Sequence, residues 1–262
     1  MTAGLAGAPV TGVRRWHMVI AGLATVALLA VCGLFSWQVL QDEFAGNAQA
    51  GQPDESGAPT RDIGTREADP EPLTEDEVFP TEEITISAGE DPYQLLDAAE
   101  SEDCTVAGAD GLADLLGDLD CIQVVRGTLH SPDEDFLVTT GVLNLASEDA
   151  ARQAYDDINE LINDQTGRFV GMLAGSGTEP IMISETKSGW DYRGHFLIYA
   201  VIAKVDGTGF TTTDDRYAEL IIWDMVEVHL RSGVLEARAT AEAPAGDRAT
   251  AGTEEDAPEG DG

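Results

Sequence analysis

The chain has 262 residues, of which 49 are acidic and 14 basic, so its formal net charge is −35 and its pI is near 4.1. A surface this negative repels phosphate backbones and anionic lipid headgroups, which argues against nucleic-acid binding. The apolar residues are concentrated in two places: a short run near the N-terminus and a longer central region.

The apolar run at residues 16–41 contains no charged residue and is bounded by Arg14 and Arg15 on one side and by Asp42 and Glu43 on the other. At about 1.5 Å per helical residue it is longer than the roughly 30 Å hydrocarbon core of a bilayer. Because the arginines favour the cytoplasm, residues 1–15 are expected inside and the C-terminal bulk outside. The sequence therefore predicts a type II, single-pass protein of the cell membrane.

Two alternatives to this anchor stay open. A cleaved signal peptide would also have a basic start, an apolar run and a small-residue pattern such as Ala48-Gln49-Ala50, but this run exceeds the usual signal core. Cys32 lies in a weak lipoprotein-like pattern, in which the bulky Val31 stands where a small residue is required. An uncleaved anchor is the better interpretation.

Residues 42–88 and 239–262 are rich in Asp, Glu, Pro, Gly and Thr and have few large apolar side chains. Such segments bury too little apolar surface to offset the entropy of ordering them. We therefore expect a disordered acidic stalk over 42–88 and a disordered acidic tail over 239–262. Residues 89–238, with ordinary apolar content, should form one extracytoplasmic domain.

Cys104 and Cys121 form an even pair in this expected extracytoplasmic context, where disulfides persist. A structural disulfide is the preferred interpretation, and free thiols or a redox pair are the alternatives, although a Cys-x-x-Cys spacing is missing. The cysteines are not accompanied by a metal-ligand pattern, and we expect neither a metal nor a cofactor.

Apolar periodicity predicts the elements of the domain in chain order. The predicted elements are a short helix over 91–100, a helix over 109–119, a hairpin of strands 121–130 and 136–145, a helix of about 16 residues capped by Ser147, strands over 181–186 and 195–205, and a final element over 214–231. The last element fits either a strand or a helix, and a helix capped by Thr213 is favoured. The turn 131–135 is acidic, but without the ligand spacing of a calcium loop we interpret it as a solvated turn.

This order predicts an α+β fold, in which a ββαββα arrangement forms one antiparallel sheet with helices packed on one face. The Arg-Arg start, the span, the acidic stalk and the strand Cys-Ile-Gln-Val-Val-Arg-Gly-Thr, followed by Phe-Leu-Val-Thr-Thr-Gly-Val, resemble single-pass membrane proteins of actinobacteria. This resemblance implies a location and a domain type, and it implies no reaction.

Trp190, Tyr192 and Arg193 lie in one segment, 188–194, that is predicted to be a loop, and they are the candidate binding patch because aromatic residues and Arg are enriched at interfaces. Packing of the same residues in the core is the alternative. The four histidines are interpreted as structural or solvated, and no catalytic residue can be assigned. We expect a non-catalytic binding or accessory module with an envelope protein as partner, and an envelope hydrolase without a recognisable motif is the alternative.

Overall fold

The computed structural model describes residues 60–241. The predicted cytoplasmic segment 1–15, the predicted span 16–41, stalk residues 42–59 and tail residues 242–262 lie outside the described residues. Within residues 60–241, none of the helices combines the length and the apolar character that crossing a bilayer requires.

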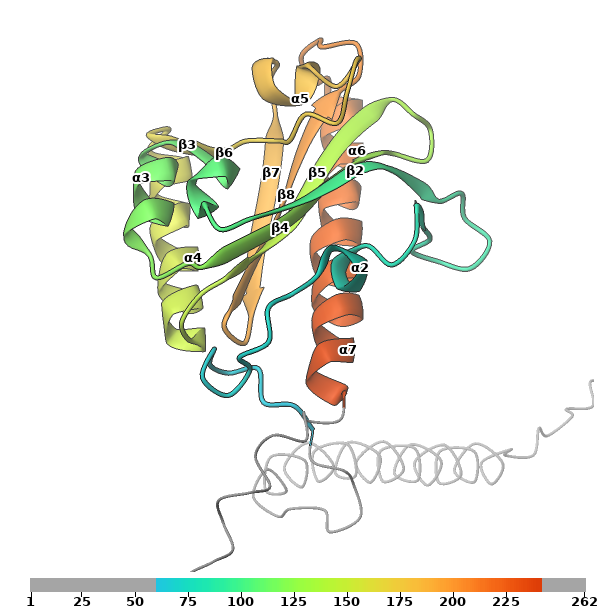
Figure 1. Ribbon diagram of the computed structural model, residues 1–262. Coiled ribbons are helices and arrows are strands. Elements are labelled where there is room, and N and C mark those ends of the chain that lie inside the picture. Colours follow the sequence, from blue (N-terminus) through green and yellow to red (C-terminus); the bar gives the residue numbers. More distant parts are fainter. Residues whose placement is uncertain (1–59, 242–262) are drawn as a thin grey trace, which may run out of the picture. The chain divides into compact units, whose positions relative to one another are not determined.

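A six-stranded antiparallel sheet lies at the centre of the fold (Figure 1). From edge to edge its strands are β1 (Glu83–Ile84), β2 (Tyr93–Ser101), β4 (Gln123–His130), β5 (Phe136–Asn144), β8 (Phe196–Lys204) and β7 (Lys187–Arg193). All nine residues of β5 are buried, as are all but the last of β8, so these two strands are covered on both faces. A separate two-stranded sheet pairs β3 (Gly108–Asp110) with β6 (Gly167–Phe169).

Helices cover both faces of the main sheet (Figure 1). One face carries the 3₁₀ turn η1 (Cys104–Ala107), α3 (Gly111–Asp118), α4 (Glu148–Asn163) and α5 (Pro180–Ile183). The other face carries α2 (Glu75–Val78) and one continuous helical run, made of α6 (Thr212–Trp223), the π-helical segment η2 (Asp224–Val234) and α7 (Leu235–Thr240).

The prediction of helices on one face only is therefore wrong. Neighbouring residues of the central strands are apolar in both directions: Val124 and Leu197 pack under α3 and α4, whereas Val125 and Ile198 pack under α6 and η2. Since successive side chains of a strand point to opposite faces, both faces of this sheet need a cover. The α+β class and the antiparallel sheet are confirmed.

Several predicted elements are confirmed: the helix at 109–119, the β4–β5 hairpin, β8 and the long helix that follows Ser147. The hydroxyl of Ser147 accepts a hydrogen bond from the Ala150 amide at 3.2 Å, as expected of an N-cap. The ambiguous segment 214–231 is helical. Its N-cap is Thr211 rather than the predicted Thr213, and Asp214 completes a capping box.

Three predicted elements are wrong. The expected helix at 91–100 is strand β2, in which a bulge between Leu95 and Asp97 breaks the alternation that would have identified a strand. The expected strand at 181–186 is the short helix α5, begun by Pro180. The expected loop at 188–194 is edge strand β7, apart from Gly194 in the turn.

The predicted disulfide is present between Cys104 and Cys121, whose Cα atoms lie 6.3 Å apart. It joins η1 to the residues that lead into β4. Closing a loop of this length is worth about 3 kcal/mol in the chain-entropy description. The bridge thereby ties the segment that carries α3 to the main sheet.

Residues 60–88, predicted as part of a disordered stalk, are instead packed against the domain. Ile63, Leu73, Val78, Phe79 and Ile84 are buried and belong to the cluster beneath η2. Composition alone predicted disorder wrongly for residues 60–88, because the few apolar residues of this segment are spaced so that nearly all of them reach the core. The fold therefore begins well before the predicted boundary at residue 89.

Candidate functional site

The predicted binding patch lies on β7, where it is divided between the two faces of the sheet. Trp190 and Tyr192 point towards α4. The ring of Trp190 lies 6.4 Å from that of Tyr155 and 5.7 Å from that of Phe169, and the ring of Tyr192 lies 5.8 Å from that of Tyr155. The Trp190 indole N–H also points at the Tyr155 carbonyl oxygen, 3.4 Å away. These aromatic residues anchor β7 to α4.

Arg193 points the other way, towards the helical run. Its guanidinium donates to the Arg231 carbonyl oxygen at 3.2 Å and pairs with Glu236, while the neighbouring Asp191 pairs with Arg231. The three residues of the predicted patch therefore do not share one surface. Their contacts hold the edge strand between α4 and the opposite helix, which is the packing role that the sequence left open.

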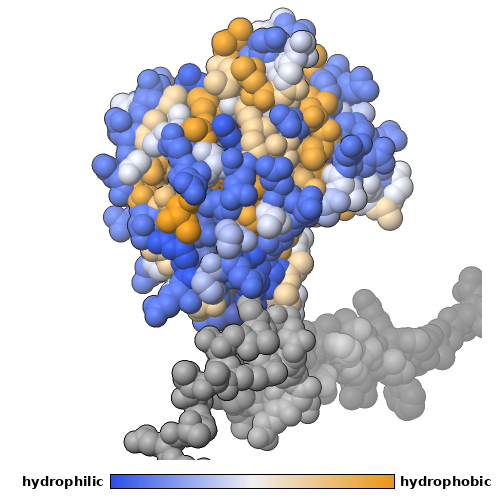
Figure 2. All heavy atoms as spheres, viewed as in Figure 1, coloured by the Kyte–Doolittle hydropathy of each residue, from blue (hydrophilic) through white to orange (hydrophobic). Residues whose placement is uncertain are grey.

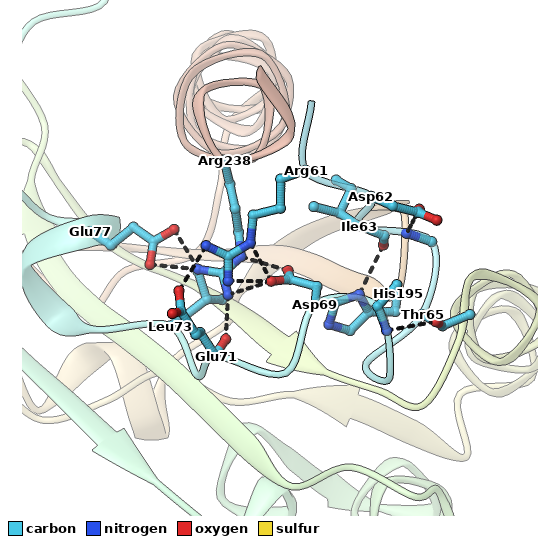
Figure 3. Close-up of polar contacts among 12 residues, drawn as sticks. Arg61, Asp62, Ile63, Thr65, Asp69, Glu71, Leu73, Glu77, His195 and Arg238 are labelled. Carbon is cyan, nitrogen blue, oxygen red and sulfur yellow. Dashed lines mark hydrogen bonds and ion pairs between the residues drawn. The ribbon is translucent and has the colours of Figure 1, made fainter. Parts of the chain in front are cut away.

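A group of charges around the buried Asp69 and Arg238 fastens residues 61–77 to α7, and we call it the α7 clasp (Figure 3). Its members are Arg61, Asp69, Glu71, Glu77 and Arg238. The side chain of Asp69 is fully buried, and Arg238 is 4% exposed. Arg238 donates to both oxygens of Asp69, at 2.7 and 3.0 Å, and to both oxygens of Glu77, each at 2.7 Å.

The two buried charges of the α7 clasp, Asp69 and Arg238, are paired with each other. Burial by itself would lower the pKa of Arg238, but the hydrogen bonds and charges of Asp69 and Glu77 outweigh it and hold the pKa above its ordinary value. Arg61 adds a second cation to Asp69, and its amide donates to the Ala241 carbonyl oxygen at 3.2 Å. The two buried members, Asp69 and Arg238, are thus paired within the fold, and removing either one would leave the other buried without its partner.

The β7–β8 turn completes the packing around this segment. His195 is buried, and its amide donates to the Ile63 carbonyl oxygen at 2.8 Å, the same oxygen that its Nδ1 approaches at 2.8 Å. Gly194, with φ of +54°, approaches so closely that a Cβ would lie 2.1 Å from the Ile63 oxygen. Burial lowers the pKa of His195, so the ring is neutral near pH 7. The His195 ring is therefore part of the packing between the β7–β8 turn and residue 63.

A hollow of about 380 Å³ opens beside α6, and we call it the α6 cleft. Its walls come from the segment that leads into β2, from the turn between β4 and β5, and from α6 and the start of η2. Its lining residues include Ile86, Glu90, Asp91, Tyr93, Asp133, Tyr217, Leu220 and Asp224. Apolar side chains and carboxylates thus face the same opening.

Tyr93 and Asp224 form a hydrogen-bonded pair in the wall of the α6 cleft. The Tyr93 hydroxyl donates to a carboxylate oxygen of Asp224 at 2.7 Å. Partial burial raises the pKa of Asp224, although the bond from Tyr93 acts in the opposite direction. Burial, together with the neighbouring carboxylate, also raises the pKa of Tyr93, so the hydroxyl keeps its proton. Perturbed groups in a cleft are typical of functional sites.

Asp224 is also the first residue of η2, the point at which the helix changes from α to π geometry. π-Helical turns are rare and often occur at functional sites. The change in winding coincides with the wall of the α6 cleft, and it separates the cleft from the part of the helix that carries Arg238.

The outer side of α6 presents three large hydrophobic side chains to solvent, and we call them the α6 row. Tyr217, Leu220 and Trp223 are 52%, 55% and 58% exposed and recur every three residues, so they lie along one side of the helix. Two of them, Tyr217 and Leu220, also line the α6 cleft. The row and the cleft therefore form one continuous surface.

Other exposed hydrophobic residues lie elsewhere. Figure 2 shows a hydrophobic group over α5, where Ile183 is 81% exposed, and Leu173 on the preceding loop is also exposed. Scattered exposed apolar residues are ordinary on protein surfaces. The α6 row differs from them because it borders the α6 cleft, in which the pKa values of Asp224 and Tyr93 are raised.

Comparison of the chain with models of known protein families, with curated proteins and with solved structures finds no match. The resemblance to actinobacterial single-pass membrane proteins stays a prediction. In the region from residue 60 to residue 241, no cluster of three or more His, Cys, Asp or Glu side chains is arranged to hold a metal ion.

The sequence contains one feature that indicates the α6 surface. Segment 214–231 fits a helix on Ala218, Ile221 and Met225, which are buried, but it also contains the apolar residues of the α6 row. A helix with a second apolar side, beyond the side that faces the core, leaves apolar side chains exposed. These additional apolar residues explain why segment 214–231 fitted both a strand and a helix. Nothing local to Tyr93 indicated that its hydroxyl would meet Asp224, which is distant in sequence.

Proposed function

We propose that residues 60–241 form a non-catalytic binding module of the cell envelope, held at the outer face of the membrane by the predicted span 16–41. The docking surface is the α6 row together with the α6 cleft, and its partner is a protein. One observation carries this proposal: three large apolar side chains, each more than half exposed, lie along one helix, and two of them line the α6 cleft.

The unfavourable exposure of these apolar side chains to water supports a binding role for this surface. Exposed Trp, Tyr and Leu side chains gain nothing from water, and aromatic residues beside a concave surface are typical of interface centres. The fold does not need these side chains for its core, because α6 already buries Ala218 and Ile221 on its inner side. Their placement is accounted for if a partner covers them.

The envelope hydrolase is the second candidate, and the raised pKa of Asp224 is the observation that favours it. A hydrolase would need Asp224 as an acid or base, and its turnover would fall by about 10²–10⁴-fold when that carboxyl group is replaced. A binding module would lose affinity instead. Asp224→Asn therefore separates the two candidates in any assay that detects either activity or binding.

Site-directed photocross-linking in intact cells tests the binding proposal. A photoreactive amino acid replaces Leu220 in the full chain, and in a matched variant it replaces Ile183, which is exposed on the opposite face. We expect a discrete cross-linked protein from position 220 that is missing from position 183. The product should be lost when Tyr217→Ser and Trp223→Ser are added.

The added substitutions should leave the fold intact, because both side chains are exposed and surface changes of this kind alter stability by about 0.5 kcal/mol or less. Circular dichroism of the purified variants checks this. Equal cross-linking from both positions, or a product from position 220 that persists in the serine variant, would contradict the proposed docking surface.

A further inference from the structure

The charges that face the α6 cleft all have one sign. Glu90, Asp91, Asp133 and Asp224 line it, and no Lys or Arg belongs to its lining among the residues that the structure describes. Arg216 lies outside that lining, and together with Glu219 it lines the adjoining hollow over the α6 row. Four carboxylates around one apolar hollow create a negative potential that the low-dielectric walls strengthen.

The carboxylates are arranged in depth. Glu90, Asp91 and Asp133 are exposed at the rim, whereas Asp224 is half-buried in the wall. Asp224 receives a neutral hydroxyl from Tyr93 but no cation within salt-bridge distance in the described part of the chain. Partly desolvated carboxylates of this kind are stabilised by a cation that enters the cleft.

Apolar groups line the same hollow. Tyr217 and Leu220 lie on α6, about two turns and one turn before Asp224, respectively, and Ile86 and the ring of Tyr93 add to the lining. A ligand that fills the cleft must therefore present a positive group and an apolar group within a few ångströms of each other. A free metal cation or a simple amine supplies only the first, and a hydrocarbon chain only the second.

Charge also decides among the possible occupants. The flanking segments 42–59 and 242–262 of this chain are acidic, so neither complements the cleft. A second copy carries the same net charge of −35 and would be repelled. Anionic lipid headgroups are repelled for the same reason. A protein segment with basic and apolar side chains meets both requirements.

We propose that the occupant of this surface is a cationic amphipathic segment of a partner protein, with its apolar side chains on the α6 row and a basic side chain beside Asp224. This inference rests on the docking surface proposed above and adds the chemistry of the partner. In helix-in-groove recognition, the bound helix lays apolar anchors spaced three or four residues apart on a hydrophobic surface, and the α6 row offers such a surface.

Three synthetic peptides of about 14 residues, the length at which an isolated helix becomes viable, serve as probes. The first has Leu on one helical face and Lys elsewhere, the second has Glu in place of Lys, and the third keeps Lys but has Ser in place of Leu. Fluorescence anisotropy measures their binding to the full chain in phosphatidylcholine nanodiscs, with empty nanodiscs as the blank.

The decisive variants remove equal charge from different places. Glu90→Gln with Asp91→Asn neutralises two rim carboxylates, and Asp156→Asn with Glu160→Gln neutralises two exposed carboxylates on α4 as the matched control. Tyr217→Ser with Trp223→Ser removes apolar contacts from the α6 row. All of these changes lie at exposed positions, so every variant should fold.

We expect only the Lys/Leu peptide to bind. The rim variant should bind it about tenfold more weakly, since two charge contacts of roughly surface strength are lost, and the α4 control should stay within about twofold of the wild type. Equal weakening by the rim variant and the α4 control would indicate attraction by net charge alone and would overturn the inference.

The remaining outcomes separate this inference from the proposed function. If the rim variant binds like the wild type while the serine variant does not, the docking surface stands and the cationic partner is wrong. If the serine variant binds like the wild type, both proposals fail at this surface. Binding of the Glu/Leu peptide, or a signal that equals that of empty nanodiscs, also overturns the inference.

Discussion

Two groups of carboxylates lie beside the same helical run and differ in how their charge is balanced. In the α7 clasp, the fully buried Asp69 meets the guanidinium groups of Arg238 and Arg61. In the α6 cleft, the half-buried Asp224 meets only the hydroxyl of Tyr93. A buried charge with a matched partner belongs to the fold, whereas one held in an open hollow without a cation is available to a ligand.

The surroundings of the two groups differ in the same way. Arg238 lies over the ring of Phe196, with 5.5 Å from its guanidinium carbon to the ring centroid, and its oxygen partners enclose it. Asp224 instead opens towards Leu220 and Tyr217, which are exposed. One helix thus serves stability at its C-terminal end and, in the proposal above, recognition nearer its N-terminal end.

The largest effect is expected from breaking the α7 clasp. Arg238→Met leaves Asp69 buried with reduced compensation, and loss of one partner of a buried pair typically costs about 3–5 kcal/mol. Urea unfolding of the full chain, followed by circular dichroism, measures the free energy of unfolding. Arg152→Ala is the control, because Arg152 and Asp149 form an exposed pair worth at most about 1 kcal/mol.

A double variant shows whether the loss of stability in Arg238→Met comes from leaving the buried Asp69 carboxylate without Arg238. Asp69→Asn combined with Arg238→Met removes both charges, so the double variant should lose less free energy of unfolding than the sum of the two single variants. Additive losses would show that the two side chains act independently, and the contrast with the α6 cleft would lose its basis.

Two groups in η2, His229 and Asp224, should also respond to acid in opposite ways. His229 packs against Phe79, with ring centroids 6.0 Å apart, and burial lowers its pKa to about 4. The unfolded chain, in which the ordinary pKa is near 6.5, therefore binds more protons than the folded chain between these values. Its contribution to stability is complete above pH 6.5 and is lost as the pH falls towards 4.

The loss attributable to His229 should reach about 3 kcal/mol at pH 4. His229→Phe removes this titration, so the free energy of unfolding of that variant should fall less steeply between pH 6.5 and 4 than that of the wild type. His195, whose pKa is also lowered, leaves a smaller slope of the same sign. Parallel pH profiles for the two proteins would contradict the assignment to His229.

Sequence periodicity predicted the parts of the fold whose signals are local. The helix after Ser147, the hairpin around 131–135 and the central strand at 196–204 follow from capping, turn chemistry and apolar runs. The Cys104–Cys121 disulfide followed from residue counting and expected location. Each of these features depends on residues close together in the sequence or on a very short list of possible partners.

The features that sequence did not predict depend on distant partners. Strand β2 exists because it pairs with β4 around a bulge, and residues 60–88 are ordered because Asp69 and Glu77 meet Arg238, more than 160 positions away. The α6 cleft likewise needs Tyr93 and Asp224 from opposite parts of the chain. In a sequence with 49 acidic residues, nothing local distinguishes Asp69, which is buried, and Asp224, which lines the cleft, from the other carboxylates.

The smallest effect, and the one that tests the comparison most directly, is expected at Asp224. Its folded-state pKa is raised, chiefly by burial, so the ionised carboxylate disfavours folding at pH 7, and this penalty disappears as the pH falls through the raised pKa. Asp224→Asn keeps an oxygen that accepts the Tyr93 hydroxyl but removes the charge. Its free energy of unfolding at pH 7 should equal or exceed that of the wild type, by about 0.5 kcal/mol. Equal or higher stability of Asp224→Asn would show that the fold does not need this charge, as expected of a group that serves binding. A clear loss of stability would instead show that the fold needs the charge of Asp224, as it needs that of Asp69.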